Sequence, residues 1–265
     1  MDYKEITRHF VFDRVPDRVE PLGEGFINDT LKVYADGLKE PSYILQRKNH
    51  VIFPDIPAMM ENIRKVTDHI HSKGVETLTL LRTTDGMLFW QDTDGNYWTM
   101  TEFNAGTRSY DRADTPQLAY QGGVGLGVFH RQVSDFTEPL SETIKGFHNI
   151  RWRFHQWDEA LRRDAASRVS SLSEEIGWIE SRRALMLGFW ERFEKGELPL
   201  RVTHNDTKIS NFLFDAKTGA LRCAIDLDTL MSSTLLNDTG DAYRSYTNTG
   251  AEDDPDTGKV SMSFE

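Results

Sequence analysis

Residues 202–228 constrain the fold of this 265-residue chain more than any other part of the sequence. Two short apolar runs flank a turn at residues 215–219, which contains an aspartate and a glycine, and this pattern predicts a β-hairpin. Polar residues lie at both ends of the hairpin, with residues 204–211 before the first strand and Asp226 and Asp228 after the second. Antiparallel pairing of the strands would bring these two polar sets together.

Transfer of a phosphoryl group needs residues of these types. Such a site places a carboxylate beside the attacking hydroxyl, holds Mg²⁺ with a carboxylate and an amide, and puts a cation near the moving phosphate. We expect Asp206 to orient the hydroxyl and Lys208 to be the cation. Asn211 and Asp226 are the expected Mg²⁺ ligands, and Asp228 is either a further ligand or a solvated strand end.

The spacing H-x-D-x-K-x-x-N, which begins at His204, matches the catalytic loop of kinases. With the I-D-L-D run at 225–228 and the pair Gly240-Asp241 followed by Arg244, it resembles the aminoglycoside phosphotransferase and choline kinase superfamily. Within that group it is most similar to the N-acetylhexosamine 1-kinases. The resemblance implies a two-lobed, protein-kinase-like α+β fold that uses ATP and Mg²⁺ to phosphorylate a hydroxyl of a small molecule, here a sugar. It also implies that His204 and Asp241 support the catalytic loop.

Two segments near the N-terminus carry the expected nucleotide contacts. A glycine-bearing turn lies between two strand-like runs, where glycines let the backbone approach a phosphate. The nucleotide contacts that the resemblance implies in this turn are Gly23, Gly25, Asn28 and Thr30. In the next strand, residues 42–49, Gln46 falls where kinases carry their phosphate-binding lysine, and Arg47 or Lys48 would supply the cation after a bulge. Gln46 and Arg47 are therefore expected nucleotide contacts, although a solvated strand edge is the alternative reading.

Residues 1–103 form the expected N-terminal nucleotide-binding lobe. A helix is predicted over residues 55–73, because an aspartate can cap it and apolar residues recur at helical spacing. Its Glu61 is a candidate partner for the strand cation. The later strands of an expected five-stranded antiparallel sheet are residues 76–83, 87–91 and 97–103. Backbone groups at Glu102 and Phe103, in the hinge that follows, are expected to read the adenine edge.

Residues 104–265 form the expected catalytic and substrate lobe, which is mainly helical. The helices predicted from apolar periodicity are residues 115–134, a segment that opens at 151, and residues 174–195. Four glycines in the first of them cost helix stability, at about 1 kcal/mol each, so we expect close helix packing there. A further helix is expected to begin at Gly240 and to be cut short. The lobe therefore looks truncated beside similar kinases.

The acceptor site is expected to use residues around position 150. A sugar ring needs planar donors and acceptors for its hydroxyls and often an aromatic face. The expected substrate contacts are His148, Arg151, Trp152 and Arg244. Two other functions remain open. An aminoglycoside or choline-type kinase would need an acidic or aromatic pocket for a cationic acceptor, and a non-catalytic nucleotide-binding protein would be consistent with the missing strand lysine.

Composition excludes some classes of partner. The chain has 31 lysines and arginines against 42 aspartates and glutamates, and its net charge of −11 argues against general nucleic-acid binding. Its single cysteine, Cys223, cannot form an internal disulfide and lies in a predicted buried strand. No signal-peptide core or membrane-length apolar run is present in the sequence. We therefore expect a cytoplasmic protein whose partner is a small-molecule hydroxyl acceptor, without a membrane or nucleic acid.

Overall fold

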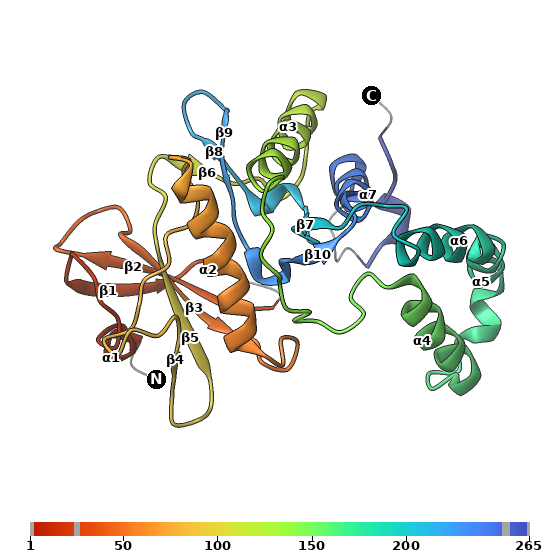
Figure 1. The fold of residues 1–265 in the computed structure, drawn as a ribbon, viewed down its shortest axis with the longest axis horizontal. Helices are drawn as coiled ribbons and strands as arrows, with labels where there is room; N and C mark the ends of the chain where they lie inside the picture. The colour runs from red at the N-terminus through yellow and green to blue at the C-terminus, as the bar shows by residue number, and fades with distance from the viewer. Residues whose placement is uncertain (1–2, 24–26, 251–254, 264–265) are drawn as a thin grey trace.

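The computed structural model describes residues 3–23, 27–250 and 255–263 and shows a sheet-based N-terminal lobe followed by a mainly helical C-terminal lobe (Figure 1). The expected α+β, protein-kinase-like architecture is confirmed. In the N-terminal lobe five antiparallel strands lie in the order β1-β2-β3-β5-β4. The strands are β1 (Pro16–Pro21), β2 (Asp29–Ala35), β3 (Tyr43–Lys48), β4 (Trp90–Gln91) and β5 (Tyr97–Glu102).

The sheet differs from the expectation at residues 76–83, which do not form a strand. This segment runs beside β5 through an isolated bridge between Leu80 and Thr101 and a hydrogen bond from Leu81 N–H to Met100 O (2.8 Å). The apolar pattern correctly indicated an extended segment that packs on the lobe. The segment makes too few backbone hydrogen bonds with β5 to form a strand of the sheet.

The two faces of the sheet pack against different partners. On one face, Tyr43, Leu45 and Met100 pack with Ile6 of α1 (Tyr3–Thr7) in a core of their own. The other side of the lobe holds α2 (Ile56–Ser72), which begins after Asp55, as predicted from the sequence, because the Asp55 carboxylate accepts the Ala58 N–H at 2.9 Å. The apolar face of α2 belongs to the core of the second lobe, so this helix joins the two lobes.

The second lobe surrounds two small antiparallel sheets. Strands β6 (Thr107–Arg108), β8 (Phe212–Asp215) and β9 (Leu221–Ala224) form one sheet in the order β6-β8-β9. Strands β7 (Arg201–Thr203) and β10 (Met231–Ser233) form the other. The predicted hairpin is therefore present as β8 and β9, with Phe212 opposite Ala224.

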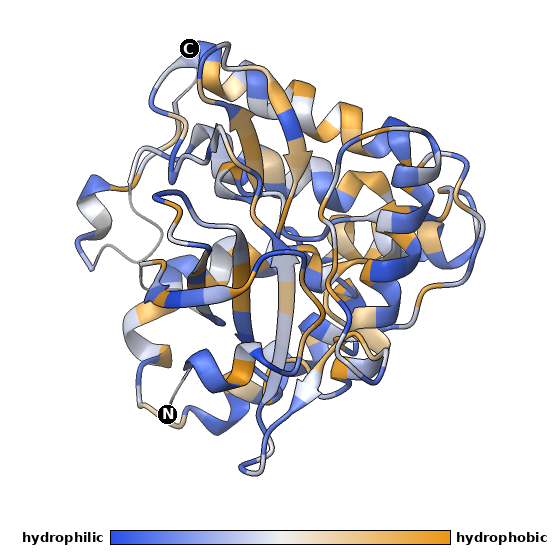
Figure 2. Ribbon diagram, turned by 90° about the vertical axis from the view of Figure 1, so that its left-hand side faces the viewer, coloured by the Kyte–Doolittle hydropathy of each residue, from blue (hydrophilic) through white to orange (hydrophobic). Residues whose placement is uncertain are grey.

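Helices make up the remainder of this lobe. They are α3 (Pro116–Gln132), α4 (Ile150–Arg163), α5 (Ser173–Glu180), α6 (Arg183–Glu194) and α7 (Leu235–Thr247), with short 3₁₀ turns η1 (Val169–Leu172), η2 (Ile209–Asn211), η3 (Leu227–Thr229) and η4 (Thr257–Lys259). Helices α4, α5 and α6 gather at the end of the molecule opposite the five-stranded sheet (Figure 1). The ribbon coloured by hydropathy shows hydrophobic residues spaced along strands and helices with hydrophilic residues between them (Figure 2).

Two helix predictions need correction. The expected single helix at 174–195 is divided into α5 and α6 at residues 181–182. Helix α7 begins at Leu235, capped by Thr234, so the Gly240-Asp241 pair lies inside the helix rather than at its start. The close packing expected for α3 is present, because a Cβ on Gly122 would lie 2.9 Å from the Tyr246 ring. None of the described helices is both long and apolar enough to cross a membrane.

Candidate active site

The loop between β7 and β8 carries the residues of the kinase-like pattern. Asp206 lies on this loop directly after Asn205, which adopts a left-handed backbone conformation with φ of 66°. Asn211, in η2, donates its side-chain N–H to both the backbone oxygen (2.9 Å) and a carboxylate oxygen (3.1 Å) of Asp206. The Lys208 ammonium lies 3.4 Å from the same carboxylate. The carboxylate, amide and cation predicted from the sequence therefore occupy one small volume.

His204 joins this loop to the end of the hairpin. Its ring Nε2 donates to Ile225 O at 2.9 Å, while Nδ1 accepts the Asp206 N–H at 3.4 Å, a pattern that fits a neutral imidazole. The Thr229 hydroxyl donates to His204 O at 2.6 Å. His204 therefore links the loop before the hairpin to the segment after it. Asp226 lies in sequence between the two residues of that segment, Ile225 and Thr229, that His204 contacts.

Asp226 lies in an unusual backbone conformation at the end of β9. Its φ and ψ are 54° and 52°, in the left-handed region that residues other than glycine rarely occupy. Burial and the neighbouring Asp228 carboxylate raise the pKa of Asp226 above its ordinary value of 3.8. A half-buried carboxylate of this kind fits a divalent cation, whose charge would offset both effects.

The donor set around Asp226 fits Mg²⁺ bound together with a nucleotide. The side-chain N–H of Asn211 donates to Asp206, which leaves the amide oxygen of Asn211 as the atom that would face a cation. Among the described residues, no three His, Cys, Asp or Glu side chains come together to hold a metal by themselves. Mg²⁺ commonly binds through one or two carboxylates together with phosphates and water, so Asn211 and Asp226 suit an ion shared with a nucleotide.

Asp228 is not the solvated strand end that was one of its two options, because it is buried and paired with a lysine. Both of its carboxylate oxygens lie within 2.8 Å of the Lys48 ammonium, and one also accepts the Asn28 side-chain N–H at 2.8 Å. The side chains of Asp228 and Lys48 are 4% and 3% exposed, so the pair is buried between the lobes. Asn28, an expected nucleotide contact, lies just before β2 and connects that end of the strand to this pair.

The strand cation is Lys48 rather than Arg47. Arg47 points to solvent, where it pairs with Asp29. Side chains alternate along a strand, so residue 48 lies on the same face as Gln46 without any bulge, and the Lys48 ammonium donates to Gln46 Oε1 at 2.8 Å. The Gln46 amide in turn donates to the Thr30 hydroxyl at 3.2 Å.

The remaining N-lobe predictions have mixed outcomes. Glu61 does not meet the strand cation, because it pairs with Arg64 on the outer side of α2. Gly23 has φ of +66°, a conformation suited to glycine, whereas Gly25 lies outside the described residues. In the hinge, the Glu102 and Phe103 N–H groups donate to Thr79 O and Ser42 O, so these two amides are occupied within the lobe.

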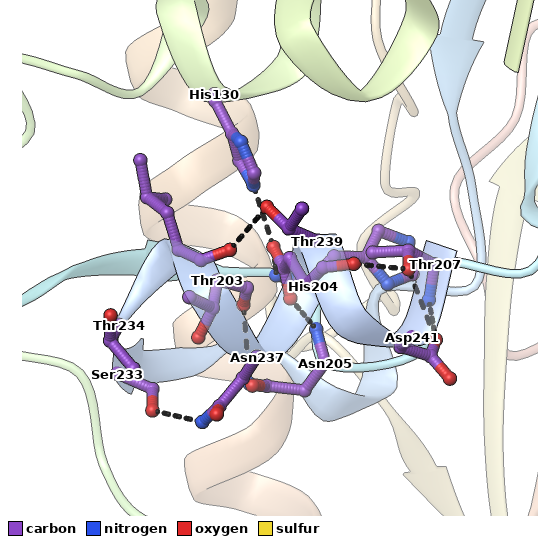
Figure 3. Close-up of polar contacts among 12 residues, drawn as sticks. His130, Thr203, His204, Asn205, Thr207, Ser233, Thr234, Asn237, Thr239 and Asp241 are labelled. Atoms are coloured by element: carbon purple, nitrogen blue, oxygen red, sulfur yellow. Dashed lines mark hydrogen bonds and ion pairs between the residues drawn. The ribbon is translucent and has the colours of Figure 1, made fainter. Parts of the chain in front are cut away.

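Asp238 is the support of the catalytic loop that sequence reasoning missed. Its buried carboxylate accepts the His204 N–H at 2.9 Å, the Asn205 N–H at 2.8 Å and His130 Nε2 at 2.7 Å. Asp241, one turn later on α7, accepts the Thr207 N–H at 2.6 Å and the Thr207 hydroxyl at 3.0 Å (Figure 3). The N-D-x-x-D pattern on α7 was the available signal, since its two aspartates lie on one helix face.

The expected acceptor residues are dispersed. His148 Nε2 donates to Asn205 O at 3.0 Å and therefore touches the catalytic loop. Arg151 instead pairs with Glu194 on the surface, and Trp152 is 37% exposed beside the turn at Gly146. Arg244 pairs with Asp241 Oδ1 at 2.9 Å.

A cavity of about 180 Å³ lies next to His148 and the catalytic loop. Its wall includes Glu142, Phe147, His148, Trp190, Phe193, Asn205 and Ser232. The Asn205 side-chain oxygen is buried and has no hydrogen-bond partner among the described residues, while the side-chain nitrogen donates to Thr229 O at 2.8 Å and to Thr203 O at 3.4 Å. The cavity thus offers aromatic surface and a carboxylate, and its wall reaches the residue next to Asp206.

Comparisons with known proteins bear on the family and the fold of the chain. Residues 18–259 match the model of the phosphotransferase enzyme family. Among solved structures, amicoumacin kinase in complex with AMP-PNP, Ca²⁺ and Ami is similar with a TM-score of 0.56 and 15% identity, covering 92% of this chain and 67% of that one.

Two further structures have comparable scores. The GDP complex of aminoglycoside 2'-phosphotransferase-IIIa has a TM-score of 0.55 and 17% identity, covering 88% of this chain and 72% of that one. Plasmodium vivax ethanolamine kinase has a TM-score of 0.56 and 14% identity, covering 89% of this chain and 62% of that one. At these identities the likeness concerns the fold.

Proposed function

The chain belongs to the phosphotransferase enzyme family, and from this premise we propose that it transfers the γ-phosphoryl group of ATP to a hydroxyl of a small molecule. The observation that carries this proposal is the convergence of Asp206, Asn211 and Asp226 at the ends of β7, β8 and β9. Phosphoryl transfer depends mainly on positioning and on stabilising charge, and these residues supply both.

Each residue has a defined part in this reaction. Asp206 accepts or orients the proton of the attacking hydroxyl, a contribution of about 10²- to 10⁴-fold for general base catalysis. Lys208 lies 3.4 Å from the Asp206 carboxylate, and its charge would offset that of the moving phosphoryl group. Asn211 and Asp226 hold the divalent ion. When bound, Mg²⁺ neutralises charge on the phosphate oxygens.

The acceptor that we propose is a sugar such as an N-acetylhexosamine. The cavity beside His148 has aromatic walls in Phe147 and Phe193, which suit the apolar face of a sugar ring. Glu142 in the same wall would accept a hydrogen bond from a ring hydroxyl.

A second candidate is an acceptor that carries an amine. Glu142 contributes a carboxylate to the cavity wall, where one oxygen accepts the Gly146 N–H at 2.8 Å. A carboxylate beside aromatic surface suits an ammonium group. The names of similar structures, an aminoglycoside phosphotransferase and an ethanolamine kinase, agree with this chemistry.

Acceptor-dependent ADP release tests the proposal. The protein is incubated with MgATP, or with MgGTP, and with N-acetylhexosamines, simple hexoses, ethanolamine, choline or aminoglycosides in turn. We expect release with one acceptor class and loss of that release in Asp206→Asn. Release with a sugar supports the first candidate and release with an amine the second. A folded, nucleotide-binding chain that releases no ADP with any of these acceptors would contradict both.

A further inference from the structure

A buried ion pair joins the two lobes next to Asp226. It links Lys48 of β3 to Asp228 of η3. The Lys48 ammonium lies 2.7 and 2.8 Å from the two oxygens of Asp228 and 2.8 Å from Gln46 Oε1. These three acceptors match the three donors of an ammonium. Both charged side chains are almost fully buried, so neither has solvent to replace a lost partner.

Two asparagines of the N-terminal lobe hold the same segment. The Asn28 side-chain N–H donates to Asp228 Oδ2 at 2.8 Å, while its oxygen accepts the Asn49 N–H at 3.0 Å. Asn62, buried on α2, donates to Leu230 O at 2.9 Å and exchanges two hydrogen bonds with the Ser141 backbone. Asn28 just before β2, Lys48 of β3 and Asn62 of α2 therefore all hold residues 228–230 of the C-terminal lobe.

This segment begins two residues after Asp226, whose backbone is in the left-handed region. A residue other than glycine stays in such a conformation where the surrounding structure determines it. On one side His204 Nε2 fixes Ile225 O, and on the other side the contacts to Asp228 and Leu230 fix the chain that follows. The backbone is therefore fixed on both sides of Asp226, and this sets the orientation of its carboxylate.

The geometry points to Lys48 as a positioning residue for the metal-binding carboxylate. Together with Asn28 and Asn62 it forms an interlobe clamp on residues 228–230, and the clamp sets the orientation of Asp226 beside Asp206. This inference rests on the proposed function for its catalytic consequence. The clamp takes the place of a pair between a strand lysine and a helix glutamate, because Glu61 is occupied by Arg64 on the outer side of α2.

Lys48→Met tests the clamp, with Lys73→Met as the matched control. Lys73 also pairs with an aspartate across the lobes, Asp135, but that pair is exposed. Two measurements need no turnover: amide hydrogen exchange over residues 226–230, and the Mg²⁺ dependence of binding of a non-hydrolysable ATP analogue by calorimetry. In Lys48→Met we expect faster exchange in that segment and about a 10- to 100-fold rise in the Mg²⁺ concentration for half-maximal binding, as when supports of metal ligands are lost. Lys73→Met should match the wild type in both.

A second variant separates positioning from folding. Lys48→Met leaves the Asp228 charge buried without a partner, whereas Lys48→Met/Asp228→Leu removes both charges and should regain thermal stability. We expect the double variant to keep the weakened Mg²⁺ dependence, and, in an active enzyme, a low kcat with little change in the KM for the acceptor. Wild-type exchange and Mg²⁺ dependence in Lys48→Met, or their full return in the double variant, would overturn the inference. If the wild type released no ADP, the proposed function would be overturned. The hydrogen-exchange and analogue-binding measurements would still show whether the clamp positions Asp226.

Discussion

His130 Nε2 donates to Asp238 Oδ2 at 2.7 Å and so joins helix α3 to helix α7 beside the catalytic loop. The same carboxylate accepts the backbone N–H groups of His204 and Asn205, at 2.9 and 2.8 Å. Asp238 is fully buried, and its charge is compensated by these three donors. The backbone that presents Asp206 is therefore held by a side chain from another element of the fold.

Asp238→Asn should weaken both stability and turnover. The substitution keeps the shape of the side chain but turns one acceptor oxygen into a donor, which faces donors already in place. A buried donor left without a partner costs about 1–3 kcal/mol, so we expect a loss of that order in the free energy of unfolding measured with urea. Displacement of the loop should lower kcat by about 10²-fold, the effect typical of a misplaced catalytic group.

Glu138→Gln is the control for this substitution, because Glu138 is an exposed acid in the loop after α3. It should leave the unfolding free energy and kcat as in the wild type. Wild-type values for both quantities in Asp238→Asn would show that the loop does not depend on this carboxylate.

Asp226→Ala should abolish turnover while the fold is retained. The substitution removes the proposed metal ligand, and it also removes a carboxylate whose raised pKa means that its charged form is disfavoured in the fold. We therefore expect a thermal midpoint at or above that of the wild type, measured without Mg²⁺. Since the proposed roles of Asp206 and Asp226 concern one transferring group, the double variant Asp206→Asn/Asp226→Ala should lose little more than Asp226→Ala alone. Near-normal ADP release from Asp226→Ala would refute the assignment.

Local patterns were sufficient to predict the frame of the site. The β8–β9 hairpin follows from the turn residues at 215–219 and the apolar runs beside them, which act over short distances along the chain. The start of α2 followed from Asp55 for the same reason. Lys48 was also within reach of sequence reasoning, because strand alternation alone places it on the face of Gln46.

Contacts between distant segments were out of reach. Asp238 and His130 are 108 residues apart in the sequence, and a helix aspartate is ordinarily exposed, so no local signal pairs them. The division of α5 from α6 at residues 181–182 occurs without glycine or proline at the break. Helix propensity is a weak guide that tertiary packing overrides, and the periodicity of this segment continues through the break.

His148→Ala should affect acceptor binding and leave nucleotide binding intact. His148 lines the cavity and donates to Asn205 O, so its loss removes a wall of the proposed acceptor site and frees the loop beside Asp206. We expect the KM for the acceptor to rise by about tenfold, the effect of one lost hydrogen bond or contact, with the KM for ATP unchanged. His155→Ala, at an exposed position on α4, is the matched control. A rise in the KM for ATP instead would place His148 on the nucleotide side.

Cys223 should be almost inert toward thiol reagents in the folded protein. Burial, with a smaller effect of Glu76, raises the pKa of its thiol to about 12 from an ordinary value of 9.0. A raised pKa lowers the thiolate fraction at any given pH, so at pH 8 about one thiol in 10⁴ is ionised instead of about one in ten, and alkylation should be about 10³-fold slower. In Cys223→Ala/Ser170→Cys the thiol is exposed, and it should react at the ordinary rate. The rate for Cys223 should rise to the same value in denaturant, and equal rates for both thiols in the native state would contradict the burial of Cys223 against Asn104.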